Sequence, residues 1–311
     1  MNTPAGEEFR LITKKRALRL RAMTIQALRR FFVERGYLEV ETPHLIPAPA
    51  PEAHIDAVPV GDAFLHTSPE LCMKRLLAAG YPRLFQICQS FRQGERGARH
   101  LPEFTLLEWY GAGMDYLDLM GECEELVLFV SRELGLGEGI SYQGTHIALQ
   151  APWERLTVRA AFDRYTSMSA EEAVREDRFD EVMVTEIEPH LGTGRPTFLC
   201  DYPAELGALA RVKRNDPGLA ERFELYMACL EIANAFSELT DPLEQRERFE
   251  RAREERRRSE KPVYPLPEKF LAALSRMPEC AGIALGVDRL IMLFADETDI
   301  ANVVTFTPEE L

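Results

Sequence analysis

The chain has 311 residues, of which 46% are hydrophobic and 28% are charged, the balance of a globular protein that can bury a sizeable core. No apolar run reaches the roughly 18 residues needed to cross a bilayer, and the N-terminal stretch lacks the apolar segment of a secretory leader. We therefore expect a cytoplasmic location and no membrane partner. The formal net charge of −14 argues against bulk nucleic acid as the main partner, because an acidic protein repels the phosphate backbone.

The six cysteines and six histidines are scattered along the chain, and no CxxC pair occurs. A structural zinc site would need closely spaced pairs of ligands. We expect reduced, mostly buried thiols that pack as small hydrophobic side chains.

In chain order, the first predicted element is a long amphipathic helix over 14–35, in which apolar residues recur at helical spacing between Arg and Lys. Gly36 ends it, and 37–41 reads as a short strand. Residues 46–63 are rich in Pro and Ala, which predicts an extended crossing segment or loop.

The next predicted helix begins with Ser68 as its N-cap and Pro69 at its first helical position. Two strands follow, over 84–92 and 104–110. The segment between them is polar and contains Gly, so we expect the two strands to form a hairpin.

The second half of the chain predicts helices over 115–134 and 168–190. Residues 224–237 are apolar and suited to a strand, and 243–258 form a highly charged helix. An apolar strand leading into a helix is expected over 282–293.

Two arginines are placed to bind a nucleotide. Arg92 stands at the base of the predicted hairpin loop, where a guanidinium would clamp a phosphate, and Phe104 beyond the loop could lie under a purine ring. Gly282, Ala284 and Gly286 leave one face of a strand almost bare, so that a flat ligand can approach closely. Arg289 follows, and its guanidinium could stack on the base.

Carboxylates within an apolar stretch suggest a cation. Glu224 and Glu231 lie in otherwise apolar runs, and a buried carboxylate needs a partner. Mg²⁺ is such a partner, since it prefers one or two carboxylates together with phosphate oxygens. Glu238 would suit the ammonium group of a substrate.

Taken together, these segments resemble the three signature motifs of class II aminoacyl-tRNA synthetases. Residues 29–43 resemble the first motif, 91–110 the second and 282–293 the third. The similarity extends over most of the chain and is greatest to lysyl-tRNA synthetases, through 67–77 and 230–241. With no internal repeat or linker in the sequence, the resemblance implies one catalytic domain over 1–311, of the α+β class, with a mainly antiparallel sheet flanked by helices.

The resemblance also implies roles for individual residues, with ATP and Mg²⁺ as cofactors and Arg92 and Arg289 as catalytic groups. The implied ATP-binding residues are Arg92, Gln93, Gly94, Glu95, His100, Leu101, Phe104, Glu224, Leu225, Gly286 and Arg289. The implied amino-acid-binding residues are Ser68, Pro69, Glu70, Glu108, Tyr110, Glu231, Asn234, Phe236, Glu238 and Ala284. The implied Mg²⁺ ligands are Glu224 and Glu231.

Within this set, Arg92 would hold the α-phosphate and the substrate carboxylate, and His100 would reach the outer phosphates. Phe104 and Arg289 would lie on the two sides of adenine. The acidic pocket suits a diamino acid better than a neutral one, because an ammonium group buried without a counter-charge is costly.

The first motif lies close to the start of the sequence, so we expect no anticodon-binding domain. A lysyl-synthetase core of this kind is similar to the elongation factor P lysine ligases. That similarity implies (R)-β-lysine or lysine as substrate, elongation factor P as acceptor, a homodimer, and tRNA as an improbable partner. Ala284 stands where lysyl-tRNA synthetases usually have Gly, and we hypothesise that its methyl group favours a β- over an α-amino group.

Three positions depart from the common second motif: Gly94 where Glu is usual, Leu101 where Asn is frequent, and Gly111 where Arg is frequent. Alternatives also remain open. The chain could be a free-standing paralogue that aminoacylates tRNA or amidates a small metabolite, or an inactive regulatory subunit. The Arg-rich helix over 243–258 could bind RNA, although its glutamates favour a solvated helix with ion pairs along its surface.

Overall fold

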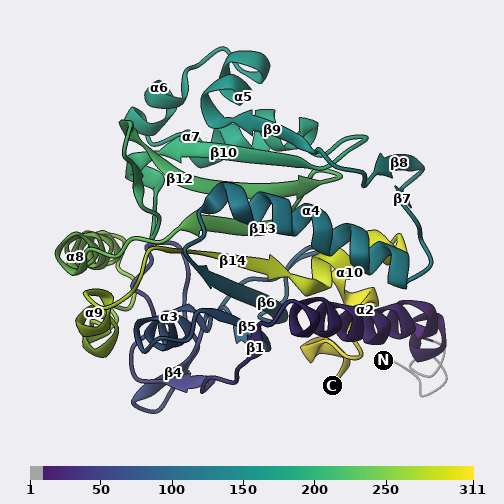
Figure 1. Ribbon diagram of the computed structural model, residues 1–311, viewed down its shortest axis with the longest axis horizontal. Helices are drawn as coiled ribbons and strands as arrows, with labels where there is room; N and C mark the ends of the chain where they lie inside the picture. The colour runs from purple at the N-terminus through teal and green to yellow at the C-terminus, as the bar shows by residue number, and fades with distance from the viewer. Residues whose placement is uncertain (1–9) are drawn as a thin grey trace.

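The computed structural model describes residues 10–311 (Figure 1). The expectation about a secretory leader concerns the N-terminal stretch 1–23, of which residues 1–9 lie outside the described part. The helices are α2 (Lys15–Glu34), α3 (Glu70–Ala78), α4 (Tyr116–Glu133), α5 (Val158–Tyr165), α6 (Ala170–Arg175), α7 (Phe179–Val182), α8 (Pro242–Arg258), α9 (Glu268–Leu274) and α10 (Val287–Ala295), with short turns η1 (Met183–Ile187), η2 (Glu188–His190), η3 (Ala204–Leu206), η4 (Ile300–Asn302) and η5 (Pro308–Glu310).

The strands that form the large sheet are β1 (Leu38–Glu39), β5 (Arg83–Phe91), β6 (Glu103–Ala112), β9 (Glu154–Thr157), β10 (Thr197–Pro203), β11 (Val212–Lys213), β12 (Asp216–Met227), β13 (Leu230–Ser237) and β14 (Cys280–Gly286). Their order is β1-β5-β6-β14-β13-β12-β10-β9, and β11 pairs with β12. Neighbouring strands run antiparallel except at the two ends, where β1 pairs with β5 and β9 pairs with β10 in parallel. The expected α+β architecture with a mainly antiparallel sheet is confirmed.

Two small sheets lie outside the large one. One contains β2 (Leu45–Ile46), β3 (Pro59–Val60) and β4 (Ala63–Leu65), and the other is the hairpin of β7 (Gly139–Tyr142) and β8 (Thr145–Ala148). Most of the Pro- and Ala-rich stretch predicted as a crossing segment connects β2 to β3 without regular structure.

Alternating side chains give the large sheet two different faces. Phe85, Trp109 and Ile283 point to one face and join the main hydrophobic cluster with residues of α2, α4 and α10. In Figure 1, α4 crosses this face, with α2 and α10 beside it. Residues one position along each strand point to the opposite face, and many of them are polar.

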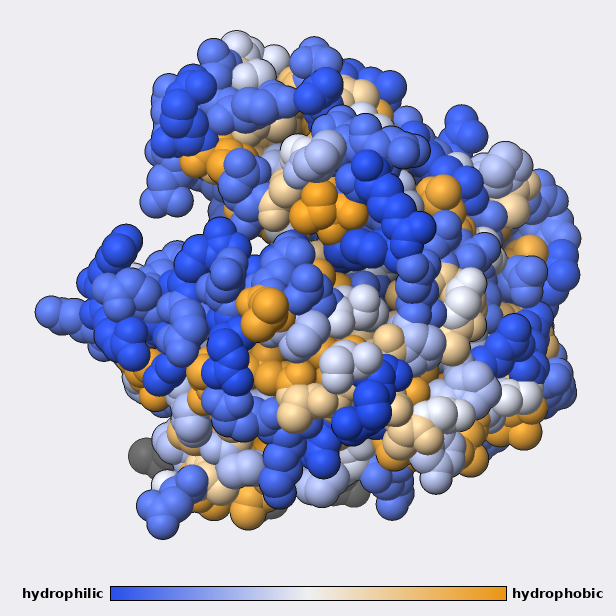
Figure 2. All heavy atoms as spheres, turned by 60° about the vertical axis from the view of Figure 1, so that its left-hand side comes forward, coloured by the Kyte–Doolittle hydropathy of each residue, from blue (hydrophilic) through white to orange (hydrophobic). Residues whose placement is uncertain are grey.

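The opposite face is covered at its two ends by separate hydrophobic clusters. At one end α3, α8 and α9 pack with Leu84 and Tyr110, and at the other α5, α6 and α7 pack on β10 and β12. The middle strands β6, β14, β13 and β12 lie between them and carry the polar residues of the candidate site. Figure 2 shows a mostly hydrophilic surface with small hydrophobic patches and a hollow between the upper and lower parts of the molecule.

Most predicted elements are confirmed, including the long first helix, the β5–β6 hairpin, the charged helix α8 and the strand β14 that leads into α10. The single helix predicted over 168–190 is wrong. The chain there forms four short pieces, because Asp177 adopts a positive φ of 54° after α6. The apolar stretch over 224–237 spans two antiparallel strands, which turn at Ala228 and Cys229 with φ values of 50° and 60°.

The six cysteines are all free thiols, as expected. No helix within residues 10–311 has the length and apolar character to cross a membrane. In the same part of the chain, no cluster of three or more His, Cys, Asp or Glu residues could hold a metal ion. That residues 1–311 form a single catalytic domain stays a prediction.

Candidate active site

Strand register places five side chains in one line across the large sheet. Gln86 lies opposite Glu108, and Glu108 lies opposite Ala284. Ala284 pairs with Asn234, which pairs with Glu224. Directly opposed residues of paired strands share a face, so the row joins residues predicted for the amino acid to a predicted Mg²⁺ ligand.

At one end of this row, Glu108 is held by two hydroxyl groups. Ser68 Oγ donates to Oε1 at 2.6 Å and Tyr110 Oη donates to Oε2 at 2.9 Å. The side chain is buried, and burial together with the charge of Glu70 raises the pKa of Glu108 to about 8. Ser68 also accepts a hydrogen bond from the backbone of Glu70, which fixes the start of α3; the helix itself begins one residue later than predicted, with Pro69 as its N-cap.

A buried lysine lies between two carboxylates of the pocket. Lys74 forms ion pairs with Glu70 and Glu238 and is 1% exposed. Burial lowers its pKa, but the charges of Glu238 and Glu70 outweigh burial, so the pKa of Lys74 is raised. Burial raises the pKa of Glu238 to about 8, and within residues 10–311 its Oε1 has no hydrogen-bond partner.

Gly282 leaves room for the side chains of Tyr110 and Glu238. A Cβ at this position would overlap the ring of Tyr110 and lie 2.5 Å from Oε1 of Glu238. The neighbouring Phe236 ring lies 5.3 Å from Nζ of Lys74. A bare strand surface is therefore needed where the acidic pocket meets the sheet.

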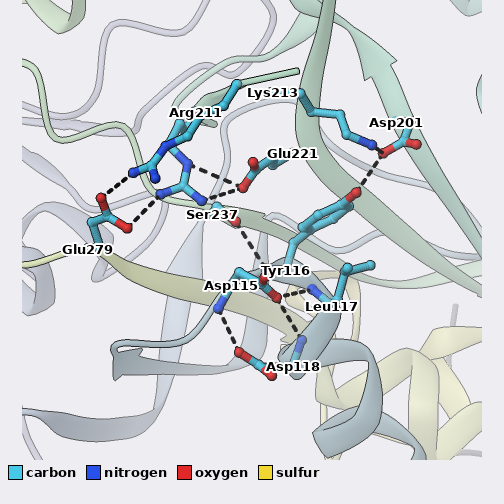
Figure 3. Close-up of polar contacts among 11 residues, drawn as sticks. Asp115, Tyr116, Leu117, Asp118, Asp201, Arg211, Lys213, Glu221, Ser237 and Glu279 are labelled. Carbon is cyan, nitrogen blue, oxygen red and sulfur yellow. Dashed lines mark hydrogen bonds and ion pairs between the residues drawn. The ribbon is translucent and has the colours of Figure 1, made fainter. Parts of the chain in front are cut away.

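The end of β13, directly before Glu238, is held by a polar network (Figure 3). Ser237 Oγ accepts a hydrogen bond from the backbone N–H of Tyr116 at 3.0 Å, and Tyr116 Oη and Lys213 Nζ both donate to Asp201. Arg211 donates to Ser237 O through its backbone, while its guanidinium lies between Glu221 and Glu279. These contacts fix the strand end, so the carboxylate of Glu238 has a defined position.

Arg289, on α10, contacts residues of two other segments. Its Nη1 donates to the backbone O of Glu231 at 2.8 Å and to Oε2 at 3.1 Å, and its Nη2 lies 2.6 Å from Nε2 of His100. Burial and the charge of Arg289 lower the pKa of His100. Two predicted nucleotide-binding residues, from the hairpin loop and α10, therefore lie together with Glu231 of β13, a predicted Mg²⁺ ligand.

Arg92 stands where β5 enters the hairpin loop. Its guanidinium lies 5.0 Å above the ring of Phe104 and 3.6 Å from Glu95, and its buried Nε has no hydrogen-bond partner among the described residues. The next residue, Gln93, donates its backbone N–H to Asp56 O at 2.7 Å. Arg92 is therefore close to the ring predicted to contact adenine and retains free donors.

The predicted Mg²⁺ ligands lie on adjacent strands. Glu224 is bound by Arg222 and by the hydroxyl groups of Tyr202 and Tyr226, at 2.6 to 2.8 Å. Partial burial and the charge of Glu224 raise the pKa of Glu231. A divalent cation would relieve this repulsion, and two carboxylates are enough when phosphate oxygens complete the shell. Glu224 and Glu231 therefore fit the Mg²⁺ ion that the family implies.

The structure explains the three departures from the common motif. Gly94 has a φ of +80°, which favours glycine at that turn, and a Cβ at Gly111 would overlap the side chain of Met114. Leu101 and Leu225 lie in the main hydrophobic cluster, so of these two residues only the backbone could face a nucleotide.

Four residues beside the site, Lys74, Arg222, Gln86 and Glu52, were not predicted from the sequence. Lys74 stands one helical turn after Glu70, a spacing that predicts contact, and Arg222 precedes Glu224 by two residues on the same strand face. Gln86 is buried with no hydrogen-bond partner for its Oε1 within the described part of the chain, and its register with Glu108 is not readable from sequence. Glu52 lies in the irregular crossing segment, where no periodic pattern marks it.

Comparison with known proteins gives a consistent picture. Residues 8–310 match the family model of the class II tRNA synthetases (D, K and N). The chain is similar to the elongation factor P--(R)-beta-lysine ligase of Pectobacterium carotovorum subsp. carotovorum (strain PC1), at 40% identity over 93% of this chain and 94% of that protein. It is similar to the protein of the same name from Salmonella typhi, at 39% identity over 92% and 93% of the two chains.

Proposed function

The chain belongs to the class II tRNA synthetases (D, K and N), and from this premise we propose that it activates (R)-β-lysine or lysine with ATP and transfers the aminoacyl group to a lysine ε-amine of elongation factor P. It is an ATP-dependent, AMP-forming ligase. The observation that carries the proposal is the free Oε1 of Glu238, a buried carboxylate oxygen beside Tyr110 and Gly282 with no hydrogen-bond partner in the described residues.

The acid-lined pocket supports a substrate with two ammonium groups. Glu70, Glu108 and Glu238 face it, and Lys74 is the cation paired with two of them. With a neutral substrate, Glu108 and Glu238 would gain no further counter-charge and would stay protonated near neutral pH, since burial raises the pKa of both to about 8. A diamino acid would supply the missing positive charge.

The first step joins the amino acid to AMP. A carboxylate oxygen of the substrate attacks the α-phosphorus of ATP, the bond to the bridging oxygen breaks, and pyrophosphate leaves. Arg92 binds the substrate carboxylate and the α-phosphate, and its charge stabilises the transition state. Arg289 and His100 bind the nucleotide from the other side. When bound, Mg²⁺ at Glu224 and Glu231 would neutralise phosphate charge.

The second step requires no nucleophile from the enzyme. The ε-amine of the acceptor lysine attacks the carbonyl carbon of the mixed anhydride, AMP departs, and the amine loses a proton as the amide forms. The role of the enzyme is to hold the adenylate and to exclude water until the acceptor arrives.

We also propose a homodimer, located in the cytoplasm. Val33, Leu38 and Leu45 are large hydrophobic residues that are 48–60% exposed in or beside the first-motif segment, and β1 lies at the edge of the large sheet. A sheet edge with exposed apolar side chains beside it is a surface suited to a second copy. Aminoacylation of tRNA and amidation of a small metabolite are not favoured, since the similar curated proteins are named for elongation factor P.

The test is mass spectrometry of elongation factor P after incubation with the enzyme, ATP and each lysine isomer. We expect one added lysyl residue with at least one isomer, and none when the lysine amines of the factor have been methylated beforehand. An unmodified factor together with charged tRNA in a parallel reaction would contradict the proposed acceptor.

A further inference from the structure

We propose that Glu52 is a further specificity-determining residue of the amino-acid pocket, and that it binds the substrate amino group nearest the carboxylate. This inference rests on the proposed function and extends it, because none of the motifs contains Glu52. Its support comes from how the crossing segment is fixed, from what surrounds the side chain, and from the charge that remains unbalanced there.

The crossing segment is anchored by a fully buried arginine of α8. Arg256 is 0% exposed, and it donates to the backbone O of Glu52 at 2.8 Å and of Ile55 at 3.0 Å. Its Nη2 also donates to Asp56 and to the hydroxyl group of Tyr264. Its Nε donates to Pro262 O at 2.6 Å, so this buried guanidinium has five partners and fixes the backbone of residues 52–56.

Further hydrogen bonds hold residues 53–57 of the crossing segment, one of them to the candidate nucleotide site. Asp56 O accepts the backbone N–H of Gln93 at 2.7 Å, and Ala57 N donates to Tyr264 Oη at 2.8 Å. Lys261 Nζ donates to Ala53 O at 3.2 Å. The backbone that carries Glu52 is therefore fixed between α8 and the residue that follows Arg92.

The Glu52 side chain faces the amino-acid pocket. It lines a small cavity with Ser68 and Glu70, which are both predicted amino-acid-binding residues. Within residues 10–311 its carboxylate forms no hydrogen bond or ion pair. Burial and the charge of Glu70 raise the pKa of Glu52 to about 7, as expected for a carboxylate that lacks a cationic partner.

The contacts of its segment place Glu52 toward the carboxylate end of a bound substrate. The backbone O of Asp56 accepts the N–H of Gln93, the residue that follows Arg92, and Glu52 shares its cavity with Ser68 and Glu70, whereas Glu238 lies beside Gly282. If Arg92 holds the substrate carboxylate, the amino group beside that carboxylate lies at Glu52. The distal ammonium group then lies near Glu238.

The cluster is short of positive charge. Glu52, Glu70, Glu108 and Glu238 face one region, where Lys74 is paired with two of them, and the free Oε1 of the buried Glu238 marks the distal end. Two ammonium groups on one substrate match two separate carboxylate positions. A substrate that lacks the proximal amino group would leave Glu52 without a partner.

The test compares two ligands that differ by that amino group. Dissociation constants for (R)-β-lysine and for 6-aminohexanoate, which keeps the carboxylate and the distal amine, are measured by calorimetry or by competition. In Glu52→Gln we expect binding of (R)-β-lysine to weaken at least about tenfold, and binding of 6-aminohexanoate to change less than about twofold. Asp62→Asn, which removes an exposed acid of the same segment, is the matched control and should change neither constant.

If Glu52→Gln weakened the binding of both ligands equally, Glu52 would act on the fold of the pocket. If neither dissociation constant changed, Glu52 would not contact the substrate. Either result overturns the inference. If the wild-type protein binds no diamino acid at all, the proposed function fails as well. The two failures are therefore distinguishable.

Discussion

Replacing Glu238 by Gln keeps the shape of a buried side chain and removes its charge. Glu238 is 1% exposed and is paired with Lys74, while its Oε1 is free. A substrate ammonium that donates to this oxygen makes a charge-assisted hydrogen bond worth ~1.5–3 kcal/mol. At ~1.4 kcal/mol for each factor of ten, the variant should lose about 10- to 150-fold in kcat/KM for lysine-dependent pyrophosphate exchange.

Norleucine separates a charge effect from general damage, because it has the same chain without the distal amine. The preference of the enzyme for lysine over norleucine should fall by the same factor in Glu238→Gln, with the fold intact by circular dichroism. Glu181→Gln is the control, since Glu181 is 61% exposed and lies on α7, outside the pocket. An unchanged preference for lysine would refute the assignment of Glu238 to the ammonium group.

The other predictions concern the shape and the titration of the same pocket. In Gly282→Ala the new methyl group overlaps the ring of Tyr110, so calorimetry should show weaker lysine binding and thermal unfolding a loss of ~1–3 kcal/mol of stability; normal binding would contradict the need for a bare strand. Ala284→Gly should shift the ratio of exchange with α-lysine to exchange with (R)-β-lysine toward α-lysine, by ~1–3 kcal/mol at most, and an unchanged ratio would remove the argument from the methyl group. Burial raises the pKa of Glu108 to about 8, so its protonated form stabilises the folded state at low pH, and this contribution is lost as pH rises toward 8. The melting temperature of the ligand-free protein should therefore fall from pH 6 to pH 8.5, and it should fall less in Glu108→Gln; parallel curves would contradict the raised pKa.

The sequence predicted those parts of the fold that local patterns specify. The helix over 14–35 and the charged helix over 243–258 have clear periodicity, and both were placed within about two residues of α2 and α8. The segment over 168–190 has the composition of a helix, but Asp177 turns the chain there with a positive φ. Composition does not report a single residue's backbone conformation, so this prediction failed.

The candidate site likewise contains residues that local motifs mark and residues that only tertiary packing places there. The resemblance of the motifs led us to predict Arg92, Arg289 and Glu238 as members of one site, because each stands beside a recognisable strand or loop, and this assignment stays a prediction. The motifs could not name Gln86 or Glu52, since their positions depend on strand register and on an irregular segment. Such contacts are set by tertiary packing, and local sequence carries little trace of them.

The central claim is that a diamino acid and a nucleotide occupy one continuous site on the face of the large sheet opposite α4. A crystal structure with a non-hydrolysable lysyl-adenylate analogue tests it most directly. We predict a single bound molecule, with its ammonium groups at the acidic pocket, its phosphate at Arg92, and its adenine between Phe104 and Arg289. An analogue bound on another surface, or with its amino-acid part turned away from Glu108 and Glu238, would contradict the account.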